Sequence, residues 1–176
     1  MNSQEINKFI KENVDKIYDE MVKVRRTIHE NPELGDEEIE TSKLIKKFMT
    51  ENGIEFFEII NTGVVATIYN DKENMKNKTV ATRADIDALP IFEENDVDYK
   101  SKNTGKMHAC GHDAHTTIQL GVAKVLAENK DKWHGTARFF FQPAEETSGG
   151  SDRMIKAGAL EFEKEKDRKI DAFFAL

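Results

Sequence analysis

The sequence has one cysteine, Cys110, and no apolar run that approaches the ~20 residues a membrane-spanning helix needs. A single cysteine cannot form a disulfide within the chain, so Cys110 is a buried hydrophobic residue, a reactive thiol or a metal ligand. The first twenty residues lack the apolar core of a secretory signal and have the pattern of a charged amphipathic helix. We therefore expect a soluble, cytoplasmic protein.

The chain also lacks an excess of positive charge. It has 26 lysine and arginine residues against 33 aspartate and glutamate residues, a balance of −7, and its basic residues are scattered. Nucleic acid and anionic membranes are therefore not expected partners. At 176 residues the chain has the usual size of one domain with its own core.

Two amphipathic helices are predicted in the first third of the chain. Apolar residues recur every three or four positions from Gln4 to about Glu30, and Pro32 ends this pattern. A second pattern of the same period begins after Asp36, a plausible N-cap, and ends at Gly53.

The rest of the chain alternates between short apolar strands and helices. The predicted strands are 54–60, 63–69, 79–84, 135–142 and 170–176, and the later helices are one that ends near Asn129 and one over 150–157. This alternation predicts an α/β sheet with helices on both faces. Because the sequence stops inside an apolar strand, we expect a C-terminally truncated chain.

A cysteine and a histidine stand two positions apart at Cys110-Gly111-His112. The glycine lets the backbone turn tightly, so the thiolate and the imidazole can face one point, as metal ligands do. The loop precedes a helix, whose N-terminal dipole favours a thiolate. The alternative is a small buried cysteine beside a surface histidine, and a pair of this kind does not decide between the two.

Two adjacent carboxylates, Glu145 and Glu146, follow an apolar strand that ends on Pro143. In an extended chain successive side chains point in opposite directions, so one carboxylate could bind a metal while the other faces the attacking water. An ordinary solvated acidic pair is the alternative. The position of Glu145 and Glu146 at the end of a buried strand favours the metal site over a solvated pair.

Asp85 and Asp87 leave the end of another predicted strand on alternate positions, so their side chains share a face. Either could accept the second ring proton of a metal-bound histidine, although a turn-forming aspartate before proline fits this segment equally well. Thiolate, imidazole and carboxylate together suit zinc or a neighbouring transition metal better than magnesium or calcium.

Four blocks, 26–34, 83–90, 107–115 and 142–146, occur in the order of a known family. With the glycine pair at 149–150, they resemble the amidohydrolase branch of the aminoacylase and carboxypeptidase G metallopeptidase family. That branch includes hippurate hydrolases, N-acyl-amino-acid amidohydrolases, N-acetyldiaminopimelate deacetylases and auxin-conjugate hydrolases. The resemblance extends from about residue 20 to the last residue.

The resemblance implies a role for each matched position. Cys110, His112 and Glu146 match the metal ligands of the family, and Glu145 matches the base that activates water. Asp87 matches the aspartate that supports the metal site in related peptidases. Four other residues in the recurrent blocks receive no ligand role: His29, Asp85, His108 and His115.

The resemblance also implies a fold and an extent. Residues 1–176 would form part of a zinc-peptidase-like, three-layer α/β/α catalytic domain, without the inserted dimerisation domain and the C-terminal half. Family members supply one further metal histidine from the strand after the Glu145-Glu146 block and another near the C-terminus. Both would lie beyond Leu176.

The implied activity is hydrolysis of the amide bond of N-acyl amino acids or short acylated peptides, with these small molecules as substrates. One or two divalent ions are expected, zinc first, with manganese, cobalt or nickel as alternatives, and the full-length protein is expected as a homodimer. The alternative is a truncated, non-catalytic metal-binding or interaction module in which Cys110 is a redox-sensitive thiol.

Overall fold

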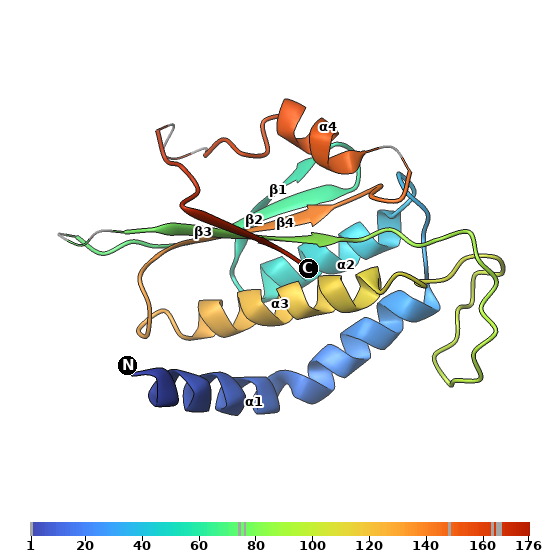
Figure 1. Cartoon of the computed structure of the whole chain (residues 1–176), viewed down its shortest axis with the longest axis horizontal. Helices are drawn as coiled ribbons and strands as arrows, with labels where there is room; N and C mark the ends of the chain where they lie inside the picture. The colour runs from blue at the N-terminus through green and yellow to red at the C-terminus, as the bar shows by residue number, and fades with distance from the viewer. Residues whose placement is uncertain (1, 74, 76, 148, 163, 165–166) are drawn as a thin grey trace.

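The computed structural model describes residues 2–73, 75, 77–147, 149–162, 164 and 167–176. Figure 1 shows its helices and strands. In chain order they are α1 (Ser3–Glu30), α2 (Ile39–Glu51), β1 (Glu55–Ile59), β2 (Gly63–Asn70), β3 (Thr79–Asp85), α3 (His112–Glu128), β4 (Gly135–Gln142), α4 (Gly150–Lys156) and β5 (Ala172–Ala175). None of the helices in the described part of the chain combines the length and the apolar character that a bilayer crossing requires.

The strands form one mixed sheet in the order β1-β2-β4-β3-β5. β2 pairs antiparallel with β1 and β4, whereas β3 pairs parallel with β4 and β5. In the β3–β4 pair Asp85 lies opposite Gln142, so these two strands end together at one edge of the sheet. In open α/β sheets, ligand sites form beside the carboxyl ends of the strands, here called the carboxyl edge.

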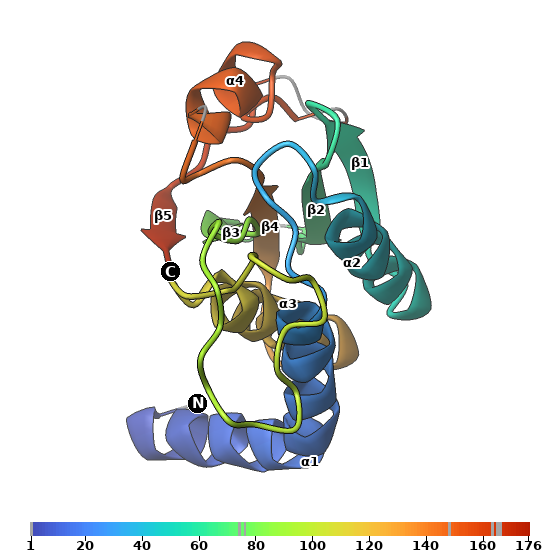
Figure 2. The ribbon, with the colours of Figure 1, turned by 90° about the vertical axis from the view of Figure 1, so that its right-hand side faces the viewer.

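The alternation of side chains along β4 builds a core on each face of the sheet. Phe139 and Phe141 pack with residues of α2 and α3, and Phe140 packs on the opposite face with Met154 of α4. Figure 2 shows α3 lying between the sheet and α1. The predicted three-layer α/β/α architecture is therefore confirmed.

Most predicted boundaries agree with the structure to within two residues, but the start of the second helix does not. Asp36 has a positive φ of 68° and pairs with Arg153, so it does not cap α2. Helix α2 instead begins at Ile39, with Glu38 at the N-cap position. The prediction that Asp36 is the N-cap was wrong.

Candidate metal centre and active site

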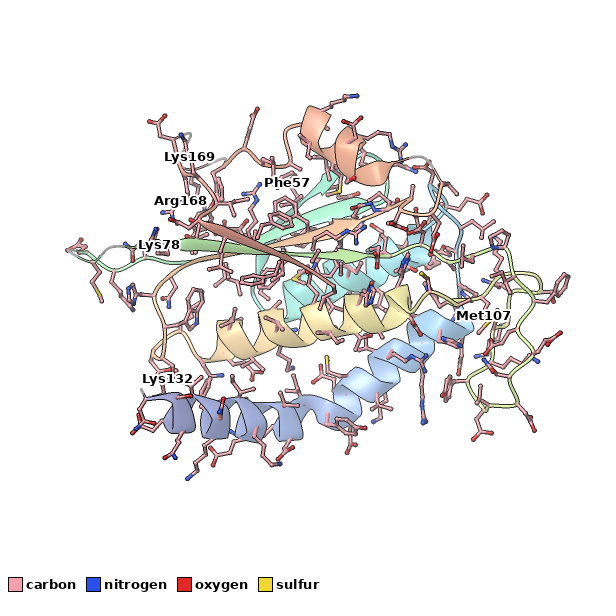
Figure 3. All side chains as sticks on the ribbon, viewed as in Figure 1. Phe57, Lys78, Met107, Lys132, Arg168 and Lys169 are labelled. Carbon is pink, nitrogen blue, oxygen red and sulfur yellow. The ribbon has the colours of Figure 1, made fainter. Side chains whose placement is uncertain are left out.

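Three segments meet at the carboxyl edge of β3 and β4. The segment after β3 is held to the end of β4 by the Ile86 amide, which donates to the Gln142 carbonyl at 3.0 Å. It is held to the segment before α3 by two hydrogen bonds between Leu89 and Met107, each 3.0 Å long. Figure 3 labels Met107 at this junction, beside the end of α1 and the start of α3. All the predicted site residues lie on these segments.

Cys110, His112 and Glu146 converge in the structure, as predicted. One ligand atom from each, the cysteine sulfur, a ring nitrogen and a carboxylate oxygen, lies within 4.8 Å of the others. Gly111 is the N-cap residue of α3 and has a φ of 93°, a conformation that glycine adopts without strain. This turn brings the side chains of Cys110 and His112 to the same point.

A hydrogen bond to Asp87 fixes the orientation of His112. Its Nδ1 lies 2.9 Å from the carbonyl oxygen of Asp87 and 3.3 Å from carboxylate Oδ1, so the closer carbonyl accepts the Nδ1 proton. Its Nε2 lies 3.7 Å from Oε1 of Glu146. Burial alone would lower the pKa of His112, but bonding to Asp87 and the charge of Asp85 outweigh it and raise the pKa above its usual value. With Nδ1 bonded to the protein, Nε2 is the nitrogen that is left for a metal.

Asp87 also holds Glu146 in place. Its Oδ2 accepts the amide proton of Glu146 at 3.0 Å, and the side chain is almost fully buried. Burial raises the pKa of Asp87, but bonds from His112 and from the amides of Glu146 and Glu145 outweigh it and leave the pKa below its usual value. Asp87 is therefore an ionised carboxylate that positions His112 and Glu146 together.

Glu145 and Glu146 lie in a turn, which differs from the extended arrangement expected from the sequence. Ala144, just before them, has a positive φ of 51°, and its amide donates to the buried carboxylate of Glu38 at 2.8 Å. This strained residue turns the chain sharply after β4. The side chain of Glu146 enters the cluster, whereas Glu145 is exposed on the same turn.

The environment of Cys110 raises the pKa of its thiol to about 11. The main cause is its hydrogen bond to Glu146, followed by burial and by the negative charges of Glu146, Asp85 and Glu145. This outweighs the expected stabilisation of a thiolate by the N-terminus of α3. A divalent cation would reverse the effect, because a coordinated thiol loses its proton.

An unpartnered oxygen of Glu146 and the mixture of ligand atoms both fit a divalent transition metal. Oε1 of Glu146 is buried and has no hydrogen-bond partner within the described residues, so this oxygen is available to a cation. Sulfur, nitrogen and oxygen ligands in one cluster are those that zinc accepts. Cys110, His112 and Glu146 would hold such an ion.

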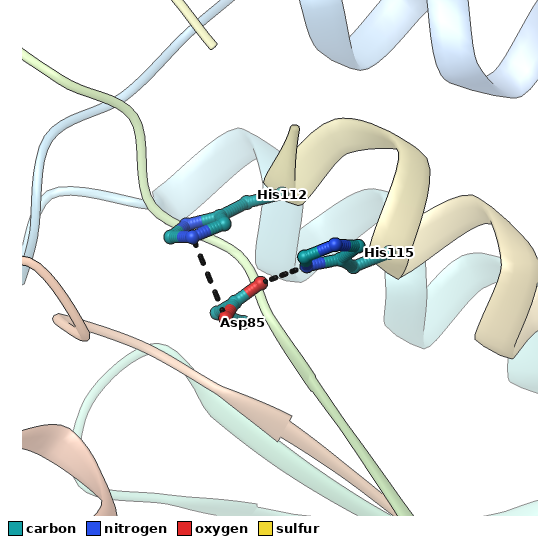
Figure 4. A group of neighbouring side chains, drawn as sticks. All are labelled: Asp85, His112 and His115. Atoms are coloured by element: carbon teal, nitrogen blue, oxygen red, sulfur yellow. Dashed lines mark hydrogen bonds and ion pairs between the residues drawn. The ribbon is translucent and has the colours of Figure 1, made fainter. Parts of the chain in front are cut away.

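A second group of possible ligands, Asp85, His112 and His115, adjoins the first (Figure 4). Nδ1 of His115 lies 2.8 Å from Oδ1 of Asp85, and Nε2 of His112 lies 3.4 Å from Oδ2. However, Arg83 forms an ion pair of 2.6 Å with the same Oδ2. Because the guanidinium already neutralises this carboxylate, Asp85 fits an orienting role for the histidines better than a ligand role.

Sequence reasoning gave no role to two other histidines near the centre, His29 and His108. Neither ring nitrogen of His108 has a hydrogen-bond partner among the described residues, and burial lowers its pKa to about 4. His29 instead lies between two buried carboxylates, those of Asp113 and Glu93. No local pattern could have revealed this contact, because His29 and Asp113 are 84 positions apart in the sequence.

Comparison with known families agrees with this geometry. The family described as peptidase family M20/M25/M40 matches residues 81–176, which contain all five predicted site residues. The match covers more than half of the chain.

Two curated relatives are similar over most of the chain. IAA-amino acid hydrolase ILR1-like 5 of Arabidopsis thaliana is 49% identical over 145 residues, which are 82% of this chain and 32% of the relative. N-acetylcysteine deacetylase of Bacillus subtilis is 43% identical over 142 residues, 80% of this chain and 37% of the relative. The chain thus spans about a third of the length of these relatives.

A solved structure shows the same arrangement of elements. The crystal structure of the Bacillus subtilis YXEP protein, described as a dinuclear metal binding peptidase, superposes with a TM-score of 0.80 and 39% sequence identity. The superposition covers 92% of this chain and 43% of the other chain.

Proposed function

The chain belongs to the peptidase family M20/M25/M40, and on that premise we propose that it carries the catalytic residues of a metal-dependent amidohydrolase. The proposed reaction is hydrolysis of the amide bond of N-acyl amino acids or short acylated peptides. The observation that carries the proposal is the convergence of Cys110, His112 and Glu146 within 4.8 Å. The names of two relatives, an IAA-amino acid hydrolase and an N-acetylcysteine deacetylase, support this class of substrate.

Zinc is the proposed ion, with manganese, cobalt or nickel as alternatives, and one or two ions are bound. The mixed thiolate, imidazole and carboxylate donor set supports this choice over magnesium or calcium. When bound, the ion would act as a Lewis acid that polarises the amide carbonyl and lowers the pKa of water.

Glu145 is the proposed general base. It follows directly on the strained turn at Ala144 and precedes the ligand Glu146, and its charge contributes to the raised pKa of Cys110, which supports this role. It would take a proton from the attacking water and later give it to the leaving amine. Asp87 acts through His112 and Glu146, which it orients, and does not exchange protons itself.

The alternative function, a redox-sensitive module built on Cys110, is disfavoured by the state of the thiol. Reactive cysteines have a lowered pKa, because the thiolate is the species that is oxidised or attacks. Glu146 and burial raise the pKa of Cys110 to about 11. A thiol of this kind suits coordination to a cation and is a poor redox sensor.

We further propose a cytoplasmic location and a homodimeric active enzyme. An exposed lone cysteine supports the location, because a reducing compartment keeps such a thiol free. The homodimer rests on the resemblance to the family alone.

Two measurements test the proposal. Zinc affinity is determined by competition with a chelator for the natural chain and for Cys110→Ser and His112→Ala, and each substitution should weaken binding by orders of magnitude. Hydrolysis of acetyl, benzoyl and indole-acetyl amino acids is then measured for the zinc-loaded protein that comprises the whole coding sequence. Equal zinc affinity in all three chains, or no hydrolysis of any acylated amino acid, would contradict the proposal.

A further inference from the structure

His29 lies in the last turn of α1, between two buried carboxylates. Its Nδ1 is 2.7 Å from Oδ2 of Asp113, and its Nε2 is 3.1 Å from Oε1 of Glu93. The side chains of all three residues are at most 4% exposed. Solvent water therefore cannot serve as a hydrogen-bond partner for these three side chains.

The hydrogen-bond inventory of this group determines its protonation. An ionised carboxylate only accepts hydrogen bonds, so both ring nitrogens of His29 must carry a proton. Arg25 does not change this conclusion, because its Nε donates to the same Oδ2 of Asp113 at 2.7 Å, whereas its Nη2 is 3.3 Å from the His29 ring. The two contacts of 2.7 Å to Asp113, one from Arg25 and one from His29, are therefore the hydrogen bonds that Oδ2 accepts.

The charges balance only if His29 is positive. Arg25 and an imidazolium at His29 then face the carboxylates of Asp113 and Glu93, two positive charges against two negative ones. A neutral ring would leave one buried negative charge uncompensated, which is costly. Glu93 accepts the Ser101 amide at 2.7 Å, and this bond stabilises its ionised form independently of His29.

Asp113 connects this cluster to the metal centre. It is the second residue of α3, directly after His112, and its other oxygen, Oδ1, accepts the amide of Ala114 at 2.9 Å. Both oxygens are thus fixed, one by α1 and one by the first turn of α3. Through Glu93, which accepts the Ser101 amide at 2.7 Å, the cluster also holds the 92–107 segment.

We infer that His29 is a buried imidazolium that positions the first turn of α3, and with it His112, for metal binding. It is a positioning residue, since it acts through Asp113 and touches no proposed ligand. Besides these partners, the ring of Tyr99 packs edge-on against His29 at 5.5 Å, and the neutral His108 ring lies 6.5 Å away. Neither offers a competing charge. The metal-binding consequence rests on the proposed function, whereas the protonation does not.

Nuclear magnetic resonance of ring nitrogens in ¹⁵N-histidine-labelled chain tests the protonation without any metal. The chain has five histidines, and the signal lost in His29→Gln identifies His29. If that variant does not fold, His→Gln variants at the other four positions give the assignment by elimination. Both His29 nitrogens should be protonated at pH 7.5, and one unprotonated nitrogen would overturn the inference.

Zinc affinity, measured by chelator competition, tests the positioning. His29→Gln should weaken zinc binding about tenfold or more, the lower end of the effect of outer-shell partners, while His134→Gln, an exposed control, should not. The double variant His29→Gln/Glu93→Gln restores charge balance, so it should bind zinc more tightly than His29→Gln alone. Zinc binding by the double variant that is no tighter than that of His29→Gln, or unchanged zinc affinity in His29→Gln, would overturn the positioning role. If no chain binds zinc but both ring nitrogens are protonated, the proposed function fails and the imidazolium stands.

Discussion

The carbonyl oxygen of Asp87 lies 2.9 Å from Nδ1 of His112, and the carboxylate of the same residue accepts the amide of Glu146 at 3.0 Å. One buried residue thus orients two of the three proposed ligands, which come from different segments, the start of α3 and the turn after β4. The backbone bond to His112 does not depend on the side chain, but the bond to Glu146 does. The two functions of Asp87 can therefore be separated by substitution.

Replacement of Asp87 by asparagine should weaken zinc binding by ~10- to 100-fold, the range seen when outer-shell partners of metal ligands are removed. The amide keeps the size of the side chain but removes the negative charge near His112 and replaces one of the two acceptor oxygens by an NH2 donor. Chelator competition provides the measurement, and Asp19→Asn, on the exposed face of α1, is the matched control. Equal affinities for the two variants would show that Asp87 does not support the centre.

Replacement of Glu145 by glutamine should leave the zinc stoichiometry unchanged and lower kcat by at least ~10²-fold, because the general base is lost while the ligands remain. Metal content is measured by mass spectrometry, and kcat with an acylated amino acid and the protein of the whole coding sequence. Glu51→Gln, at the exposed end of α2, controls for the loss of a surface charge. Retained kcat would remove Glu145 from this role.

The pH dependence of zinc binding should report the Cys110 thiol. Its pKa of about 11 means that the metal-free protein holds this proton at pH 8, whereas a coordinated thiolate does not. Binding therefore releases the proton, and affinity should rise about tenfold per pH unit between about pH 8 and pH 9. In Cys110→Ser this dependence should be absent. A pH-independent affinity in the natural chain would mean that Cys110 does not bind zinc as a thiolate.

The sequence alone was sufficient for the elements of the sheet and for the residues that meet at its edge. Strand β4 begins and ends where its apolar run does, at Gly135 and Gln142. Its alternating Phe139, Phe140 and Phe141 then divide between the two cores. The periodicity of apolar residues is a local property of the chain, and this explains why these features were predictable.

Features that depend on contacts between distant segments were not predictable in this way. From their spacing alone, Asp85 and Asp87 could each orient a metal-bound histidine. In the structure they contact different histidines: Asp85 contacts Nδ1 of His115, while Asp87 contacts Nδ1 of His112. The conformation of Ala144 depends likewise on Glu38, which is 106 positions away. Such pairings follow from packing in three dimensions, which no local pattern encodes.

Gly150→Ala should destabilise the fold strongly. A β-carbon at this position would lie 1.7 Å from the carbonyl oxygen of Pro143, a backbone atom that cannot move aside easily. We expect a loss of about 3 kcal/mol in the free energy of unfolding, at the upper end of overpacking effects. Gly149→Ala is the matched comparison, since its β-carbon would meet no atom within 4 Å and only its φ of 64° costs about 1 kcal/mol. Urea denaturation of both variants tests this order, and equal midpoints would contradict the predicted clash.

The last prediction concerns association through β5. This strand pairs with β3 on one side, and no strand of the described residues pairs with its other side. Phe174 on β5 is 61% exposed. An open strand edge with apolar side chains favours pairing with another chain, so the protein should associate as its concentration rises.

Phe174→Lys should reduce this association, because a charged side chain on an edge strand opposes pairing between chains. Phe92→Lys is the matched control. Phe92 is 71% exposed, more than Phe174, but it lies on the irregular segment after β3 and offers no strand edge. Light scattering coupled to size-exclusion chromatography, at several concentrations of each chain, measures the effect. If Phe92→Lys reduced association as much as Phe174→Lys did, apolar exposure in general, and not the edge of β5, would drive it.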